Sequence, residues 1–94
     1  MPTNYARGRQ FEYRAMKILH SNNFLAIRSA GSHGVADLIA ASPDGTRYVI
    51  QVKSGKAKPT QQERITLKFV AARFQATPQI WTFKPRKPLE VETL

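Results

Sequence analysis

The chain has 94 residues, of which 41% are hydrophobic and 22% charged, a composition typical of a globular protein rather than a disordered one. We expect a single domain over residues 1–94, because a chain of this length supports one core, and this excludes a multidomain enzyme with a large enclosed pocket. Cysteine is absent, so disulfides, a cysteine nucleophile and a thiolate zinc site are excluded as well.

The charge is strongly unbalanced, with 15 Lys and Arg against 6 Asp and Glu and a net charge of +9. Such an excess predicts a polyanionic partner, most simply nucleic acid, with an anionic membrane surface or a basic protein without such a partner as alternatives. There is no apolar run of about 18 residues, and residues 1–7 hold no apolar signal segment. We therefore expect a cytoplasmic protein, in the host cytoplasm or nucleoid if viral, that is neither secreted nor bound to a membrane.

The first part of the chain predicts one helix and three strands. Residues 5–21 have apolar side chains at the i, i+4, i+7 and i+8 spacing of a buried helical stripe. The members of this stripe are Phe11, Ala15, Ile18 and Leu19. Short apolar runs then predict strands over 24–27, 35–41 and 47–53.

The turn between the second and third strands has Pro-Asp-Gly chemistry and five residues. A turn of this length pairs Ala41 with Arg47 and, counting back, places Asp37 opposite Gln51. Directly opposed residues lie on the same face of a sheet. Lys53 follows Gln51 by two positions and points to that face too. We therefore expect an acid, an amide and an ammonium to gather on one side of this hairpin.

A second helix is predicted over 60–75, where Thr60 and Glu63 have the spacing of a capping box. Its apolar residues form two stripes on different sides, and a helix of this kind must be covered on both. We infer a homodimer in which the helix lies between its own sheet and the partner subunit. One stripe is Ile65, Phe69 and Ala72, and the other is Leu67, Val70, Ala71 and Phe74.

A fourth strand is predicted over 79–83, and residues 85–94 are expected to form a short edge strand or a frayed end. The element order is then α-β-β-β-α-β. This order predicts an α/β fold with a mixed central sheet flanked by helices.

Two acids and one lysine carry the chemical argument, and each has an ordinary alternative. Asp37 interrupts an apolar strand, where an acid is costly unless it is paired, solvated or bound to metal. It could simply contact Lys53 at the strand end, and Lys53 could be a solvated lysine. Glu12, beside the apolar stripe of the first helix, could be a surface acid paired with Arg9.

Taken together, these residues resemble the PD-(D/E)xK nuclease superfamily, and most closely the archaeal-type Holliday junction resolvases. A helical acid, an acid on a strand and a polar–x–Lys triplet on the paired strand make up the pattern. The resemblance covers about residues 5–84, and its segments are the helix start at 7–12, the strand and serine loop at 24–32, and the hairpin strands at 35–40 and 48–54. The chain departs from the family in two places: Ala36 stands where a proline is expected, and Gln51 where a glutamate is expected.

The resemblance implies a restriction-endonuclease-like core and a Mg²⁺-dependent endodeoxyribonuclease that resolves four-way DNA junctions by paired strand nicks, with Mn²⁺ expected to substitute. It implies that Lys53 orients the attacking water or offsets charge in the transition state, and that Arg28 and Ser32 position the phosphate. His33, in the same loop, receives no assigned role. The implied metal ligands are Glu12, Asp37, Gln51 and the carbonyl of Val52. The expected DNA-binding residues are Arg7, Arg9, Arg14, Lys17, Arg28, Lys56 and Lys58.

Gln51 leaves two interpretations of this site open, because a glutamine oxygen can bind a hard cation but carries no charge. It is either a true ligand or the sign of a weakened site. The alternative functions are a restriction-like nuclease that cuts other duplex DNA and a non-catalytic basic DNA-binding module.

Overall fold

The computed structural model describes residues 4–29 and 34–94. Within these residues the strands form one five-stranded sheet in the order β1-β2-β3-β4-β5, in which β3 and β4 are parallel and all other neighbours antiparallel. The elements are α1 (Asn4–Ser21), β1 (Leu25–Arg28), β2 (Leu38–Ala41), β3 (Arg47–Ser54), α2 (Gln61–Arg73), β4 (Thr77–Phe83) and β5 (Glu90–Thr93). The α/β prediction and the predicted element order are confirmed, with β5 added as a fifth strand.

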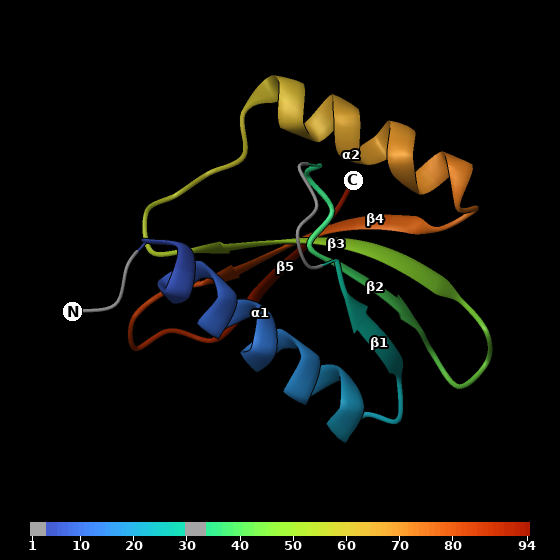
Figure 1. Cartoon of the computed structure of the whole chain (residues 1–94), viewed down its shortest axis with the longest axis horizontal. Coiled ribbons are helices and arrows are strands. Elements are labelled where there is room, and N and C mark those ends of the chain that lie inside the picture. Colours follow the sequence, from blue (N-terminus) through green and yellow to red (C-terminus); the bar gives the residue numbers. More distant parts are fainter. Residues whose placement is uncertain (1–3, 30–33) are drawn as a thin grey trace.

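The two helices cover opposite faces of the sheet (Figure 1). Successive residues of a strand point to opposite faces, so β3 contributes to both halves of the core. Ile50 belongs to the cluster beneath α1, and Val49 belongs to the cluster beneath α2. The buried residues on the α1 side are Ala15, Leu19, Leu38, Ala40, Ile50, Trp81 and Phe83, and those on the α2 side are Val49, Leu67, Ala71 and Ile80.

The β2–β3 hairpin has the predicted pairing, with Ala41 opposite Arg47. Asp44 fixes the turn, because its carboxylate accepts hydrogen bonds from the hydroxyl of Ser42 and from the N–H of Thr46. Gly45 takes φ +89°, a left-handed conformation that glycine adopts at little cost. The sequence therefore predicted both the length of this turn and the alignment of the two strands that it joins.

The ladder ends earlier than predicted, at Leu38, although the strand was expected to begin at residue 35. The N–H of Asp37 donates to the carbonyl of Ile50 at 2.9 Å, so Asp37 departs from the alignment as residues do at a β-bulge. The expectation that Asp37 lies directly opposite Gln51 in the ladder is therefore wrong. Its carboxylate instead reaches the main chain of Val52, between Gln51 and Lys53.

The C-terminal residues form the edge strand rather than a frayed end, since Glu90–Thr93 pairs with β4. β4 itself begins two residues earlier than the predicted 79–83 strand, and β1 lies one residue later than predicted. No helix in the described ranges is long and apolar enough to cross a membrane.

Helix α2 begins with the predicted capping box, in which Thr60 and Glu63 exchange both hydrogen bonds. Leu67 and Ala71 are fully buried against the sheet. Phe69, from the other predicted stripe, is 63% exposed, so α2 leaves an apolar side uncovered. Phe74 was expected on the same stripe as Leu67 but is 49% exposed, because it is the C-cap residue and the helix ends before it can turn inward.

Candidate active site

Asp37 lies directly before β2, where its carboxylate accepts a hydrogen bond from the N–H of Val52 at 2.8 Å. Burial raises the pKa of this carboxyl from 3.8 to about 6. The negative charges of Glu12 and Glu63 add to the increase, whereas the Val52 N–H and the charge of Lys53 oppose it. Burial and two neighbouring acids thus disfavour the ionised form of Asp37. A bound cation would offset this cost, and perturbed carboxyls of this kind are common at functional sites.

Gln51 and Lys53 extend from the same face of β3 and meet one carboxylate of α2. The Nε2 of Gln51 donates to Oε2 of Glu63 at 3.0 Å, and the Nζ of Lys53 lies 3.3 Å from the same oxygen. The expectation that Gln51 and Lys53 share a face is confirmed by these contacts. Gln51 is only 3% exposed, and its Oε1 is buried without a hydrogen-bond partner in the part of the chain that the structure describes.

Glu12 reaches the site from α1 and is paired with Arg28 of β1, with 3.2 Å between the guanidinium Nη1 and the carboxylate Oε1. Both side chains are largely buried, at 20% exposed for Glu12 and 15% for Arg28. The Arg28 guanidinium also lies 4.9 Å from the centre of the Tyr13 ring, a cation–π distance. Glu12 therefore has a strong partner other than Arg9, and it remains close enough to act electrostatically on Asp37.

Two of the expected site residues lie beyond what the structure describes in detail. Ser32 falls outside the described residues, as does its neighbour His33, and of Arg7 only the main chain is described. The expected arrangement of the phosphate-positioning loop therefore stays a prediction.

Glu63 is the residue of this site that sequence reasoning missed as a participant. Its place at N3 of a capping box accounted for it fully as a structural residue. Lys53 and Gln51 precede it by 10 and 12 positions, a separation that no short motif reveals. One available signal was the missing carboxylate at Gln51, which invites a search for another acid nearby.

The donors around Asp37 fit a hard divalent cation, although no group of three or more His, Cys, Asp or Glu side chains suited to a metal occurs among the described residues. Mg²⁺ is usually held by one or two carboxylates together with carbonyl oxygens, waters and phosphate oxygens. Asp37 supplies a carboxylate, and the unpartnered Oε1 of Gln51 supplies a buried oxygen of the right kind. The site therefore offers few negative charges, but its oxygen donors are of the kind that Mg²⁺ binds.

Comparison with known proteins gives this donor set a family context. The model of a family described as archaeal Holliday junction resolvase (Hjc) matches residues 3–93. The chain belongs to the archaeal Holliday junction resolvase family. A solved structure of Archaeoglobus fulgidus Hjc, a Holliday junction resolvase from an archaeal hyperthermophile, matches with a TM-score of 0.77 and 28% sequence identity, covering 89% of this chain and 73% of that one. A search of curated proteins finds no match.

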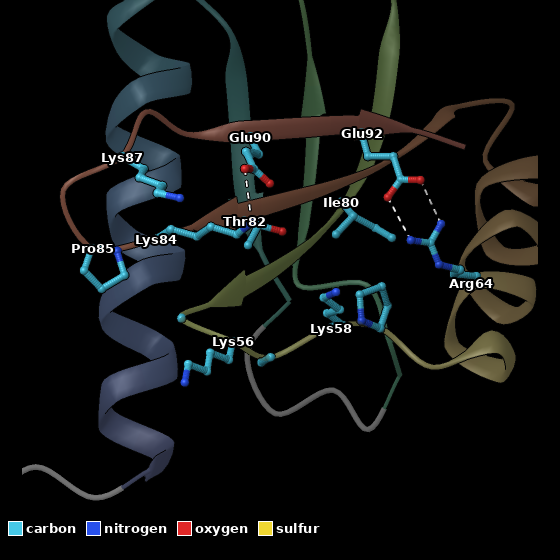
Figure 2. Close-up of a pocket in the computed structure, with 13 residues that line it drawn as sticks. Lys56, Lys58, Arg64, Ile80, Thr82, Lys84, Pro85, Lys87, Glu90 and Glu92 are labelled. Carbon is cyan, nitrogen blue, oxygen red and sulfur yellow. Dashed lines mark hydrogen bonds and ion pairs between the residues drawn. The ribbon is translucent and has the colours of Figure 1, made fainter.

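The resolvase-family chain has a basic pocket of about 800 Å³ between the loop after β3 and the β4–β5 hairpin (Figure 2). Two of its cations are neutralised by acids of β5. Lys84 pairs with Glu90 at 3.1 Å, and Arg64 of α2 makes a bidentate ion pair with Glu92 at 2.9 Å. The lysines of the pocket that make no ion pair within the described ranges are Lys56, Lys58 and Lys87.

Among the expected DNA-binding residues of this resolvase-family chain, Arg14 stands over the ring of Phe83 at 5.1 Å and lines a neighbouring hollow with Lys87. Lys17 is exposed on α1. The basic segment 84–87 before β5 was predicted only to break a strand. It lines both hollows, and so lies between Arg14 on one side and Lys56 and Lys58 on the other.

Proposed function

We propose that this chain is a Mg²⁺-dependent endonuclease that resolves four-way DNA junctions by hydrolysing one phosphodiester bond in each of two strands. Its family and the described activity of the Archaeoglobus fulgidus neighbour support the substrate. The observation that carries the chemistry is the partly buried carboxyl of Asp37, close to the charge of Lys53, on a hairpin that also holds the buried, unpartnered Oε1 of Gln51. Mn²⁺ is expected to replace Mg²⁺, because both bind oxygen donors.

The residues that would hold the ion are Asp37, Gln51 and the carbonyl of Val52, with Glu12 acting directly or through water. The chemistry that a bound divalent ion supplies is polarisation of the scissile phosphate and a lowered pKa for an attacking water. Lys53 offsets the negative charge that develops on the phosphate in the transition state. Partial burial of these side chains limits their contact with bulk water, which strengthens each of these interactions.

The positive surface supports recognition of DNA through its phosphates, which fixes the position of the arms without reading base sequence. We infer that one arm runs along the basic pocket of Figure 2 and the exposed side of α1. Ser32 is expected to approach the scissile phosphate from the loop before β2. The cations assigned to the DNA are Arg7, Arg9, Arg14, Lys17, Arg28, Lys56 and Lys58, to which we add Lys87.

We further infer a homodimer through α2, whose outer side carries Ile65 at 52% and Phe69 at 63% exposure. A two-fold dimer presents two active sites related by symmetry, and a four-way junction is itself approximately two-fold. Paired nicks in opposed strands follow from that match. The substrate also suggests that the protein works in the cytoplasm.

The test is a nicking assay on a synthetic four-way junction and on a linear duplex of the same arm sequence, each with Mg²⁺, Mn²⁺ or chelator. We expect symmetric nicks in the junction only, and only with metal. Equal cleavage of the linear duplex would favour a restriction-like nuclease instead. Binding of the junction without cleavage in either metal would favour a non-catalytic module.

A further inference from the structure

Glu63 connects the cap of α2 to the polar residues of β3 with both of its carboxylate oxygens. On the helix side, Oε1 accepts from the N–H of Thr60 at 2.9 Å. On the sheet side, Oε2 accepts from Gln51 Nε2 at 3.0 Å and from Lys53 Nζ at 3.3 Å. The capping box thus fixes this carboxylate in place, and Gln51 and Lys53 of the proposed nuclease site both donate to it.

This contact determines which end of the Gln51 amide faces the metal site. An ionised carboxylate only accepts hydrogen bonds, so the donating NH₂ end of Gln51 must face Glu63. The opposite orientation would set two oxygens against each other. Oε1 is therefore turned away from Glu63 and left buried without a partner among the described residues, which is costly unless a cation or donor satisfies it.

We propose that Glu63 is a positioning residue of the nuclease site, which holds the Gln51 amide with its oxygen toward the metal and supplies the negative charge that glutamine lacks. The inference rests on the proposed function, because it assigns Glu63 a role toward the ion bound by Asp37 and Gln51. The family pattern puts a carboxylate at position 51. In this chain a carboxylate stands behind the amide instead, joined to it by one hydrogen bond.

The same carboxylate also fixes Lys53. The Lys53 and Glu63 side chains are 21% and 30% exposed, so the pair is partly screened from solvent. With Glu63 present, the Lys53 ammonium is held beside the site with a counter-charge. Without it, the ammonium is free to move toward Asp37, where it competes with the metal for the carboxylate.

The first test is Glu63→Gln, with Mn²⁺ binding followed by calorimetry. Glutamine at N3 also suits a capping box, so the helix start is preserved and thermal unfolding checks the fold. Because glutamine both donates and accepts, it no longer forces one orientation on Gln51. We expect Mn²⁺ binding to weaken about tenfold or more, the usual loss on removing an outer partner of a metal ligand. The metal concentration for half-maximal junction cleavage should rise by the same factor, while the KM for the junction stays unchanged.

The second test exchanges the two groups in the double variant Gln51→Glu/Glu63→Gln. The amide at 63 then donates to a carboxylate at 51, so the charge and the hydrogen bond are both restored. We expect Mn²⁺ affinity at least equal to that of the wild type.

The matched control is Asp44→Asn, which removes one negative charge from the turn at the other end of β3. It should leave Mn²⁺ binding unchanged. Mn²⁺ binding by Glu63→Gln within about twofold of the wild type, against the tenfold expected, would overturn the proposal, and so would a double variant no better than Glu63→Gln. If the wild type itself binds no Mn²⁺ and cuts no junction, the proposed function fails together with this inference.

Discussion

Replacing Asp37 with asparagine should abolish cleavage and yet stabilise the metal-free protein at neutral pH. Burial and two neighbouring acids raise the pKa of Asp37 to about 6, so the ionised form opposes folding. Asparagine is neutral and nearly isosteric. Its amide oxygen can still accept the hydrogen bond that Val52 N–H donates at 2.8 Å.

The size of the effect follows from the pKa difference between the folded and unfolded states. The pKa of Asp37 rises from 3.8 to about 6. Since each pKa unit corresponds to about 1.4 kcal/mol, the gain in unfolding free energy on removing this charge has an upper limit of about 3 kcal/mol. Solvent screening of a site that is not fully buried reduces that value, so we expect a gain of about 1–2 kcal/mol. In a domain of this size this corresponds to an increase in Tm of roughly 4–16 °C.

The pH dependence has a definite sign. A carboxyl whose pKa is raised on folding stabilises the native state while it is protonated, fully below its unfolded value of 3.8. That contribution is lost as the pH rises through about 6. Wild type and Asp37→Asn should therefore unfold with similar free energies below about pH 4. The variant should become the more stable protein between that pH and neutrality.

The assay is thermal or urea unfolding in chelator across this pH range, alongside junction binding and nicking. Added Mn²⁺ should raise the Tm of the wild type and leave that of the variant unchanged, since ligands stabilise only the state that binds them. The variant should bind the junction but not nick it. A variant less stable than the wild type at neutral pH, or one that cleaves at the wild-type rate, would refute the reasoning.

Three further predictions concern the surroundings of the site. Phe69→Glu should convert the proposed dimer to a monomer in light scattering, with the stability of the monomer changed by less than about 0.5 kcal/mol because the side chain is exposed; a wild type that is already monomeric would contradict the proposed interface. Arg28→Ala should cost about 1–3 kcal/mol in urea unfolding, because it leaves the partly buried Glu12 carboxylate unpaired, and adding Glu12→Gln should recover most of that loss. Leu67→Ala should destabilise by about 3 kcal/mol, since Leu67 is fully buried between α2 and the sheet; a loss below about 1 kcal/mol would contradict the packing of α2.

The parts of the fold that depend on short-range chemistry were predictable from the sequence. The alignment of β2 with β3 followed from five turn residues, because a turn of fixed length leaves one pairing. The start of α2 followed from Thr60 and Glu63, whose two hydrogen bonds are local. The placement of Gln51 and Lys53 on one face of β3 followed from strand alternation alone.

The contacts that shape the site were not predictable in this way. The departure of Asp37 from the ladder changes its hydrogen-bond partner by one residue, and no residue type in 35–41 encodes that step. Arg28 lies 16 positions from Glu12, so their pairing depends on how α1 crosses β1. The edge strand β5 was one of two open outcomes, since its charged residues favour neither a strand nor a frayed end until Glu92 meets Arg64.

The distribution of acids in this basic chain argues that the site is more than a structural ion-pair network. The chain has six acids against fifteen basic residues. Two of the six, Glu90 and Glu92, pair with cations at the β5 edge, and Asp44 holds a turn. Of the other three, Glu12 and Glu63 both lie close enough to Asp37 for their negative charges to raise its pKa. A protein that binds a polyanion gains nothing from gathering acids around one partly buried carboxyl, where they disfavour its ionised form and repel the phosphates. A divalent cation at Asp37 removes both repulsions, and the same argument predicts that junction binding without metal should tighten when Asp37 is neutralised.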